Sequence, residues 1–307
     1  MAAFLGYIAE RGKAFLLLGL VCGLVFEYLA QLIRPWLPEL IFVLLFLTSV
    51  RIGPAVFGAQ LGKRRHSLWI VLLFQLLVPL VVVGLCLWLD INIQLGVGLA
   101  VALLFSAPSV TGAPNFAILM GYAPEEVLRI LILGVLLFPL TVMPVLLLSD
   151  VFPAPINVLY AAMKLAGAVL AAFTVAMLLR RSLLPEVNNK SLDGLASILL
   201  VVVVIGLMSK ITPMLQQDPW YVGRILLLAC ALNLGGQMVA MFSLHRWRGT
   251  EAVGDAIQFG NRNIALFLMA LPTNMADSLL VFIGCYQIPM YLTPLVMNPF
   301  YNRFKTL

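Results

Sequence analysis

Four polar side chains stand close together in an otherwise apolar segment, "GDAIQFGNRNIALFLMALP", which covers residues 254–272. They are Gln258, Asn261, Arg262 and Asn263, and Arg262 keeps its charge at any physiological pH. A guanidinium presents its N–H donors in a planar fork that suits two-point recognition of a carboxylate. The segment is therefore a candidate anion-binding site.

The composition of the chain predicts an integral membrane protein. Of its 307 residues, 63% are hydrophobic and only 10% are charged, and the mean hydropathy is +1.06. Apolar runs of 17 or more residues recur about every thirty positions, and about 20 residues of helix span the hydrocarbon of a bilayer. We predict an all-α protein with ten transmembrane helices, at residues 13–32, 37–53, 67–89, 94–121, 125–149, 155–179, 192–215, 222–244, 252–272 and 277–301.

The basic residues predict the orientation of these spans. With the N-terminus inside, 13 Lys and Arg fall on the inner side and 3 on the outer side. The inner set is Arg11, Lys13, Arg51, Lys63, Arg64, Arg65, Arg180, Arg181, Lys190, Arg246, Arg248, Arg303 and Lys305. This asymmetry predicts a multi-pass protein of the cell (inner) membrane with both termini in the cytoplasm. It also accounts for the net charge of +6 without nucleic-acid binding.

Two parts of the chain resemble each other. "NFAILMGYAP", which starts at Asn115, matches "NIALFLMALP", which starts at Asn263, in its Asn, its Ala and its final Pro. Further on, "PLTVMP" at residues 139–144 and "PMYLTP" at residues 289–294 have two prolines at the same spacing. Two matched patterns in the same order indicate an internal duplication.

The duplication predicts two five-helix repeats, residues 1–150 and 151–307, of opposite topology because five is an odd number. Inverted repeats are typical of secondary transporters, whose binding sites lie where interrupted helices of the two halves meet. The fourth span contains "APSVTGAPN" at residues 107–115, where two prolines and Gly112 interrupt a helix. The ninth span contains Gly260 among the polar residues described above.

Two questions stay open at this level. Arg262 either binds a substrate anion or is satisfied by backbone carbonyls of the interrupted fourth span. Lys164, in the sixth span, either faces the cavity as a second cation or pairs with Glu27 of the first span, because unpaired charges in lipid are disfavoured. We expect substrate contacts from Thr111, Asn115, Lys164, Gln258, Asn261, Arg262 and Asn263.

Three motifs resemble the bile acid:sodium symporter family, a group of sodium-coupled carriers for organic anions. "PSVTGAPN" resembles the family's Pro-Gly-Gly-Thr-Ala-Ser-Asn, "QFGNRN" its Glu-Val-Gly-Met-Gln-Asn, and "FQLLVP" its third-span Gln followed by Pro. The resemblance implies a core domain of spans 3–5 and 8–10, in which broken helices 4 and 9 cross. It also implies a panel domain of spans 1, 2, 6 and 7.

The same resemblance implies that the sodium sites of the family are altered here. Gln75 and Asn115 match sodium-ligand positions, but Pro114 stands where the family has Ser, Gln258 where it has Glu, and Arg262 where it has Gln. In the family's site, one Glu and two sodium ions give a net charge of +1. In this chain, neutral Gln258 and Arg262 give the same net charge. We therefore predict that Arg262 replaces the sodium-site cation and that no cofactor is needed.

The resulting prediction is a secondary transporter for a small organic anion, working by alternating access without sodium, as a monomer or homodimer in the lipid bilayer. The alternatives are a sodium-coupled symporter of the same family type and a non-transporting receptor or sensor. An arsenite-efflux permease would need a cysteine near the fourth-span break, and no Cys lies between Cys86 and Cys230. The chain has no HExxH or GxSxG motif and no paired carboxylates at the crossing, so we do not expect an enzyme.

Overall fold

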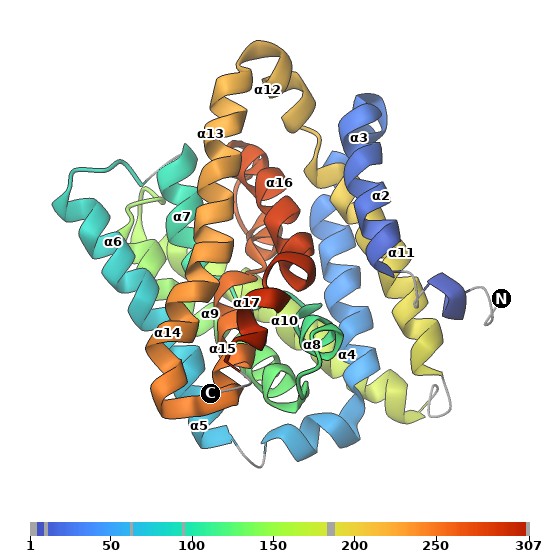
Figure 1. The fold of residues 1–307 in the computed structure, drawn as a ribbon. Coiled ribbons are helices and arrows are strands. Elements are labelled where there is room, and N and C mark those ends of the chain that lie inside the picture. The colour runs from blue at the N-terminus through green and yellow to red at the C-terminus, as the bar shows by residue number, and fades with distance from the viewer. Residues whose placement is uncertain (1–4, 9–11, 62–63, 94–95, 183–187, 305–307) are drawn as a thin grey trace.

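The computed structural model describes residues 5–8, 12–61, 64–93, 96–182 and 188–304, which are almost entirely helical and contain no β-strand (Figure 1). Three of the basic residues counted on the inner side, Arg11, Lys63 and Lys305, lie outside this part. The helices of the first half are α2 Gly12–Val25, α3 Glu27–Ile33, η1 Arg34–Trp36, α4 Leu37–Leu61, α5 Arg64–Leu72, η2 Leu73–Leu77, α6 Val78–Trp88, α7 Gly96–Ser106, α8 Ala113–Leu119 and α9 Glu125–Leu148. Those of the second half are α10 Pro155–Ser182, α11 Asn189–Leu207, α12 Ile211–Gln217, α13 Pro219–Cys230, η3 Ala231–Gly235, α14 Gly236–Arg248, η4 Gly249–Glu251, α15 Ala252–Gly260, η5 Ile264–Met269, α16 Thr273–Val296 and α17 Asn298–Asn302.

Seven helical stretches in the described residues are long and apolar enough to cross a membrane. They are Glu27–Pro54, Arg65–Trp88, Glu125–Leu148, Pro155–Ser182, Asn189–Gln217, Pro219–Gly260 and Thr273–Asn302. Phe15–Val25 and Gly96–Ser106 are shorter apolar helices. The prediction of a helical, multi-pass membrane protein is thus confirmed, whereas the count of ten stays a prediction.

The remaining predicted spans are short or joined to a neighbour for local reasons. The first is interrupted at Phe26, whose φ of −102° and ψ of 72° are not helical. The fourth is divided between α7 and α8. The ninth contributes α15, which follows α14 after a turn at Gly249, where a φ of +56° favours a residue without a side chain.

The helices pack as two bundles. The smaller bundle consists of α2, α3, α4, α10 and α11, which pack mainly on one another. The larger bundle contains α5–α9 and α13–α16, and the bundles meet where α10 packs on α9 and α4 packs on η5. In Figure 1, α3 and α12 mark what we call the upper end, and α5 with the turn between α14 and α15 marks the lower end.

The tryptophans are all exposed, and two of them mark the ends of a membrane-sized helical rod. All five are between 63% and 86% exposed, at positions 36, 69, 88, 220 and 247. Trp220 and Trp247 occupy the two ends of the continuous α13–η3–α14 rod, and 27 residues of helix correspond to about 40 Å. This length matches the distance between the two headgroup layers, where tryptophan is enriched.

Candidate functional site

The two predicted interruptions meet at the centre of the larger bundle. Between α7 and α8 the chain is non-helical at residues 107–112, and between α15 and η5 it is non-helical at residues 261–263. Ser109 and Arg262 form an isolated antiparallel bridge. The amide of Val110 donates to the carbonyl of Asn261 at 2.8 Å, and the amide of Asn263 donates to that of Pro108 at 2.8 Å. Each interruption therefore satisfies backbone groups that the other exposes, as hydrocarbon requires.

A glycine allows this close approach. A Cβ atom at Gly260 would lie 2.2 Å from Cγ of Gln237 and 2.4 Å from the carbonyl oxygen of Asn233. No side chain fits there without moving α14 or η3. The Gly260 carbonyl in turn accepts hydrogen bonds from the side chains of Asn233 and Tyr286.

Arg262 is buried at the crossing, with 3% of its surface exposed. Its Nε–H donates to the carbonyl of Phe259 at 2.9 Å, Nη1 to that of Ala107 at 3.0 Å, and Nη2 to that of Phe74 at 3.2 Å. Its Cζ also lies 5.5 Å and 5.4 Å from the ring centres of Phe74 and Phe259. Ala107 lies in the interrupted fourth span. Its contact is therefore the one expected if backbone carbonyls of that span satisfy Arg262.

The charge of Arg262 nevertheless has no acidic partner, since none of the ion pairs between described residues includes it. The three carbonyl bonds use three of the five guanidinium N–H groups, which leaves one on each terminal nitrogen. Arg262 thus combines a structural role with two further donors of the kind that a carboxylate accepts.

A second buried group of polar side chains packs beside the crossing. Oδ1 of Asn261 accepts from Asn233 at 3.2 Å and from Thr293 at 2.9 Å, while Gln237 donates to Asn233 at 2.9 Å. The hydroxyl of Tyr301 completes the group by donating to Gln237 at 2.8 Å. Of these, the sequence singled out only Asn261. Asn233 and Gln237 lie four residues apart on one helical face, which is the signal that would have indicated them.

Two π-helical turns, η2 and η3, each place an amide side chain beside the crossing. Gln75 is the central residue of η2 and donates to the carbonyl of Gly134 at 3.1 Å. Asn233 is the central residue of η3 and donates to Gly260. Such turns are rare and concentrate at functional sites.

A small cavity lies between the two bundles, next to the crossing. Its volume is about 30 Å³, room for a few water molecules at most. The smaller bundle contributes aliphatic side chains only, and the larger bundle contributes the polar groups. The lining residues are Ile41, Leu44, Leu45, Leu200, Val203 and Leu207 from the smaller bundle, and Val110, Thr111, Arg262, Asn263, Ala265, Leu266, Gln287, Met290 and Tyr291 from the larger.

Three of the predicted substrate residues, Thr111, Arg262 and Asn263, border this cavity. Asn261 belongs to the buried amide group instead. Gln258, 1% exposed, donates to the carbonyl of Val127, and its Oε1 has no hydrogen-bond partner in the structure.

The other predicted site residues lie elsewhere. Asn115 is exposed on α8 and Lys164 is exposed on α10, and neither lines the cavity. Pro114 is buried in the first turn of α8, where proline is well tolerated. In the described part of the chain, no ion pair joins Lys164 to Glu27.

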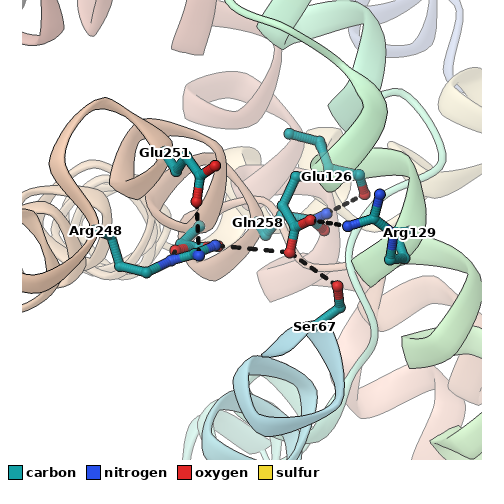
Figure 2. Close-up of polar contacts among 8 residues, drawn as sticks. Ser67, Glu126, Arg129, Arg248, Glu251 and Gln258 are labelled. Atoms are coloured by element: carbon teal, nitrogen blue, oxygen red, sulfur yellow. Dashed lines mark hydrogen bonds and ion pairs between the residues drawn. The ribbon is translucent and has the colours of Figure 1, made fainter. Parts of the chain in front are cut away.

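A charge cluster ties helices of both halves together at the lower end (Figure 2). Arg248, at the end of α14, contacts Asp255 at 2.8 Å, Glu251 at 2.8 Å and Glu126 at 3.6 Å. Glu126 also pairs with Arg129 and accepts a hydrogen bond from Ser67 at 2.8 Å. Asp255 is fully buried, so Arg248 is its necessary counterion.

No family model and no curated protein sequence matches the chain. The function is therefore inferred from the geometry and chemistry of the site.

Proposed function

We propose that this protein is a secondary transporter for a small organic anion and a divergent relative of the bile acid:sodium symporters. The observation that carries the proposal is the buried Arg262 charge, which has no carboxylate partner among the described residues and borders a cavity between two helix bundles. A charge at this depth is costly enough that a functional role is the default interpretation. A substrate carboxylate is the counterion that the site lacks.

We further propose that the chain consists of two inverted five-helix repeats, residues 1–150 and 151–307, and ten transmembrane helices. Three matched pairs of features support this: the two interruptions, the π-turns η2 and η3, and the prolines inside α9 and α16. In this scheme the larger bundle is the core domain and the smaller bundle is the panel domain. The charge asymmetry supports a cell (inner) membrane location with the upper end outside and both termini in the cytoplasm.

Alternating access requires the cavity to be closed on one side at a time. In the described conformation, contacts between the two bundles lie toward both ends of the molecule from the cavity. At the upper end, Arg34 of η1 and Asp277 in the second turn of α16 form a two-point ion pair between the bundles. Toward the lower end, Leu45, Leu131 and Phe173 belong to an apolar cluster between α4, α9 and α10. We propose that these two contacts open in turn during alternating access.

The proposal includes sodium independence. Of the five residues that match sodium-site positions, Pro114 has no side-chain oxygen and Asn115 is exposed on α8. Arg262 contributes a positive charge and donors, whereas sodium needs oxygen ligands. A sodium ion beside Arg262 would meet like-charge repulsion in a medium of low effective dielectric.

The test is transport by the full chain in proteoliposomes, read as current on a solid-supported membrane. Small carboxylates are screened with and without sodium and proton gradients, against protein-free vesicles. We expect at least one carboxylate to give a saturable signal that does not need sodium. A sodium-dependent signal would favour the sodium-coupled alternative, binding without transport would favour the receptor, and no response to any carboxylate would contradict the anion site.

A further inference from the structure

One buried polar side chain at the cavity has no assigned role. Gln287 lies in α16, is 5% exposed, and borders the cavity together with Arg262. Among the hydrogen bonds formed by the described residues, none involves its amide group. Buried side-chain amides are nearly always hydrogen-bonded, and each offers two donors and an acceptor. Gln287 therefore presents unused donors and an acceptor at the same cavity as the unpaired cation.

The structure holds Gln287 in a fixed relation to Arg262. The neighbouring residue, Tyr286, donates its hydroxyl to the carbonyl of Gly260, two residues before Arg262. On the other side of Gln287, Thr293 donates to Oδ1 of Asn261 at 2.9 Å. Helix α16 is thus hydrogen-bonded to the interrupted segment on both sides of Gln287. These bonds fix the position of the Gln287 amide relative to the Arg262 guanidinium at the cavity.

We propose that Gln287 is the second recognition residue of the site and selects carboxylates that carry a further hydrogen-bonding group. This inference rests on the proposed function, because it takes Arg262 as the carboxylate partner. The smaller bundle adds only aliphatic side chains to the lining. A hydroxyl, carbonyl or amide group on the substrate can therefore find its partner in Gln287, with Thr111 and Asn263 on the same polar face.

The test compares acids that differ by one hydroxyl group: propionate with lactate, and butyrate with 2-, 3- and 4-hydroxybutyrate. Binding to the purified full chain is measured by calorimetry. We expect at least one hydroxy acid to bind about tenfold more tightly than its parent, the ratio expected for one satisfied hydrogen bond at a buried polar group. In Gln287→Leu this ratio should fall to near one, while the parent acids keep their affinity within about threefold.

Two variants make the result specific. Met290→Leu changes another lining residue without changing its polarity, so the ratio should stay as in the wild type. Gln287→Glu keeps the shape of the side chain but adds a negative charge, and it should weaken all the acids. Each variant is checked for a single symmetrical peak in size-exclusion chromatography.

The outcomes separate the two proposals. If the parent acids bind but hydroxy acids show no advantage, or if Gln287→Leu leaves the advantage unchanged, the role of Gln287 is overturned and the anion site stands. If Gln287→Leu weakens every acid equally, Gln287 only shapes the cavity and the proposal is wrong. If none of the acids binds the wild-type protein, the anion site itself fails, and the role of Gln287 fails with it.

Discussion

Replacing Arg262 with methionine should destabilise the protein substantially, because its guanidinium bridges three backbone carbonyls at the crossing. The substitution keeps an unbranched apolar stem but leaves the carbonyls of Phe259, Ala107 and Phe74 without this donor. Each orphaned buried acceptor costs about 1–3 kcal/mol. The burial penalty of the guanidinium, several kcal/mol, is relieved at the same time. The three acceptors together cost about 3–9 kcal/mol, and the relieved burial penalty offsets part of this, so we expect a net loss of about 2–4 kcal/mol.

The assay is thermal unfolding of the full chain in detergent, followed by circular dichroism. For a chain of this size, a loss of 2–4 kcal/mol corresponds to a fall in Tm of roughly 5–10 °C. Arg224→Met is the matched control, because Arg224 is exposed on α13, and it should change Tm by no more than about 2 °C. Arg262→Lys keeps the charge but not the planar fork and should fall between the two. An unchanged Tm in Arg262→Met would refute the bridging role derived from the three carbonyl contacts.

Reversing the charge of either Arg34 or Asp277 should speed the reaction of a cysteine placed at Thr111 with an impermeant thiol reagent added outside. The double reversal should restore the slow rate, and equal rates in all variants would contradict a closing role for the ion pair. Gly260→Ala should prevent normal folding, seen as aggregation in size-exclusion chromatography, because its Cβ would overlap Gln237. Gly223→Ala, with open space at its Cβ, should instead stay monodisperse. Finally, calorimetry in sodium and in matched potassium should give the same affinity for any bound carboxylate, and a tenfold tightening by sodium, about 1.4 kcal/mol, would show that the ion still binds.

The interruptions could be predicted because proline and glycine act locally. Pro108, Gly112 and Pro114 are concentrated in seven residues, and this density of helix breakers predicts the interruption, whereas the more widely spaced prolines of α9 and α16 lie inside continuous helices. The helix resumes at Ala113, before the predicted end of the interruption, because Pro114 fits the first turn of a helix. The residue at which α8 begins decides which side of the helix Asn115 occupies, and here Asn115 is exposed. The residue type alone could not predict this exposure.

The rest of the site depends on tertiary packing. Gln287 and Thr293 are single polar residues in an apolar helix, and only the packing of α16 decides that one borders the cavity while the other joins the amide group. Arg262 was expected either to bind an anion or to be held by backbone carbonyls. The structure adds the carbonyl contacts and leaves two donors, so these two roles are compatible in one side chain.

The pairing of the two interruptions has a consequence for biosynthesis. Val110 bonds to Asn261 and Pro108 to Asn263, so each partner is made about 150 residues after the first segment. While the second half is still being synthesised, residues 107–112 are already in or near the bilayer, and the backbone groups of Asn261 and Asn263 that pair with them do not yet exist. The first half must therefore wait in an incomplete state, shielded by water, lipid headgroups or a membrane chaperone. A chain truncated before residue 261 would remain in that state and be a preferred substrate for membrane proteases.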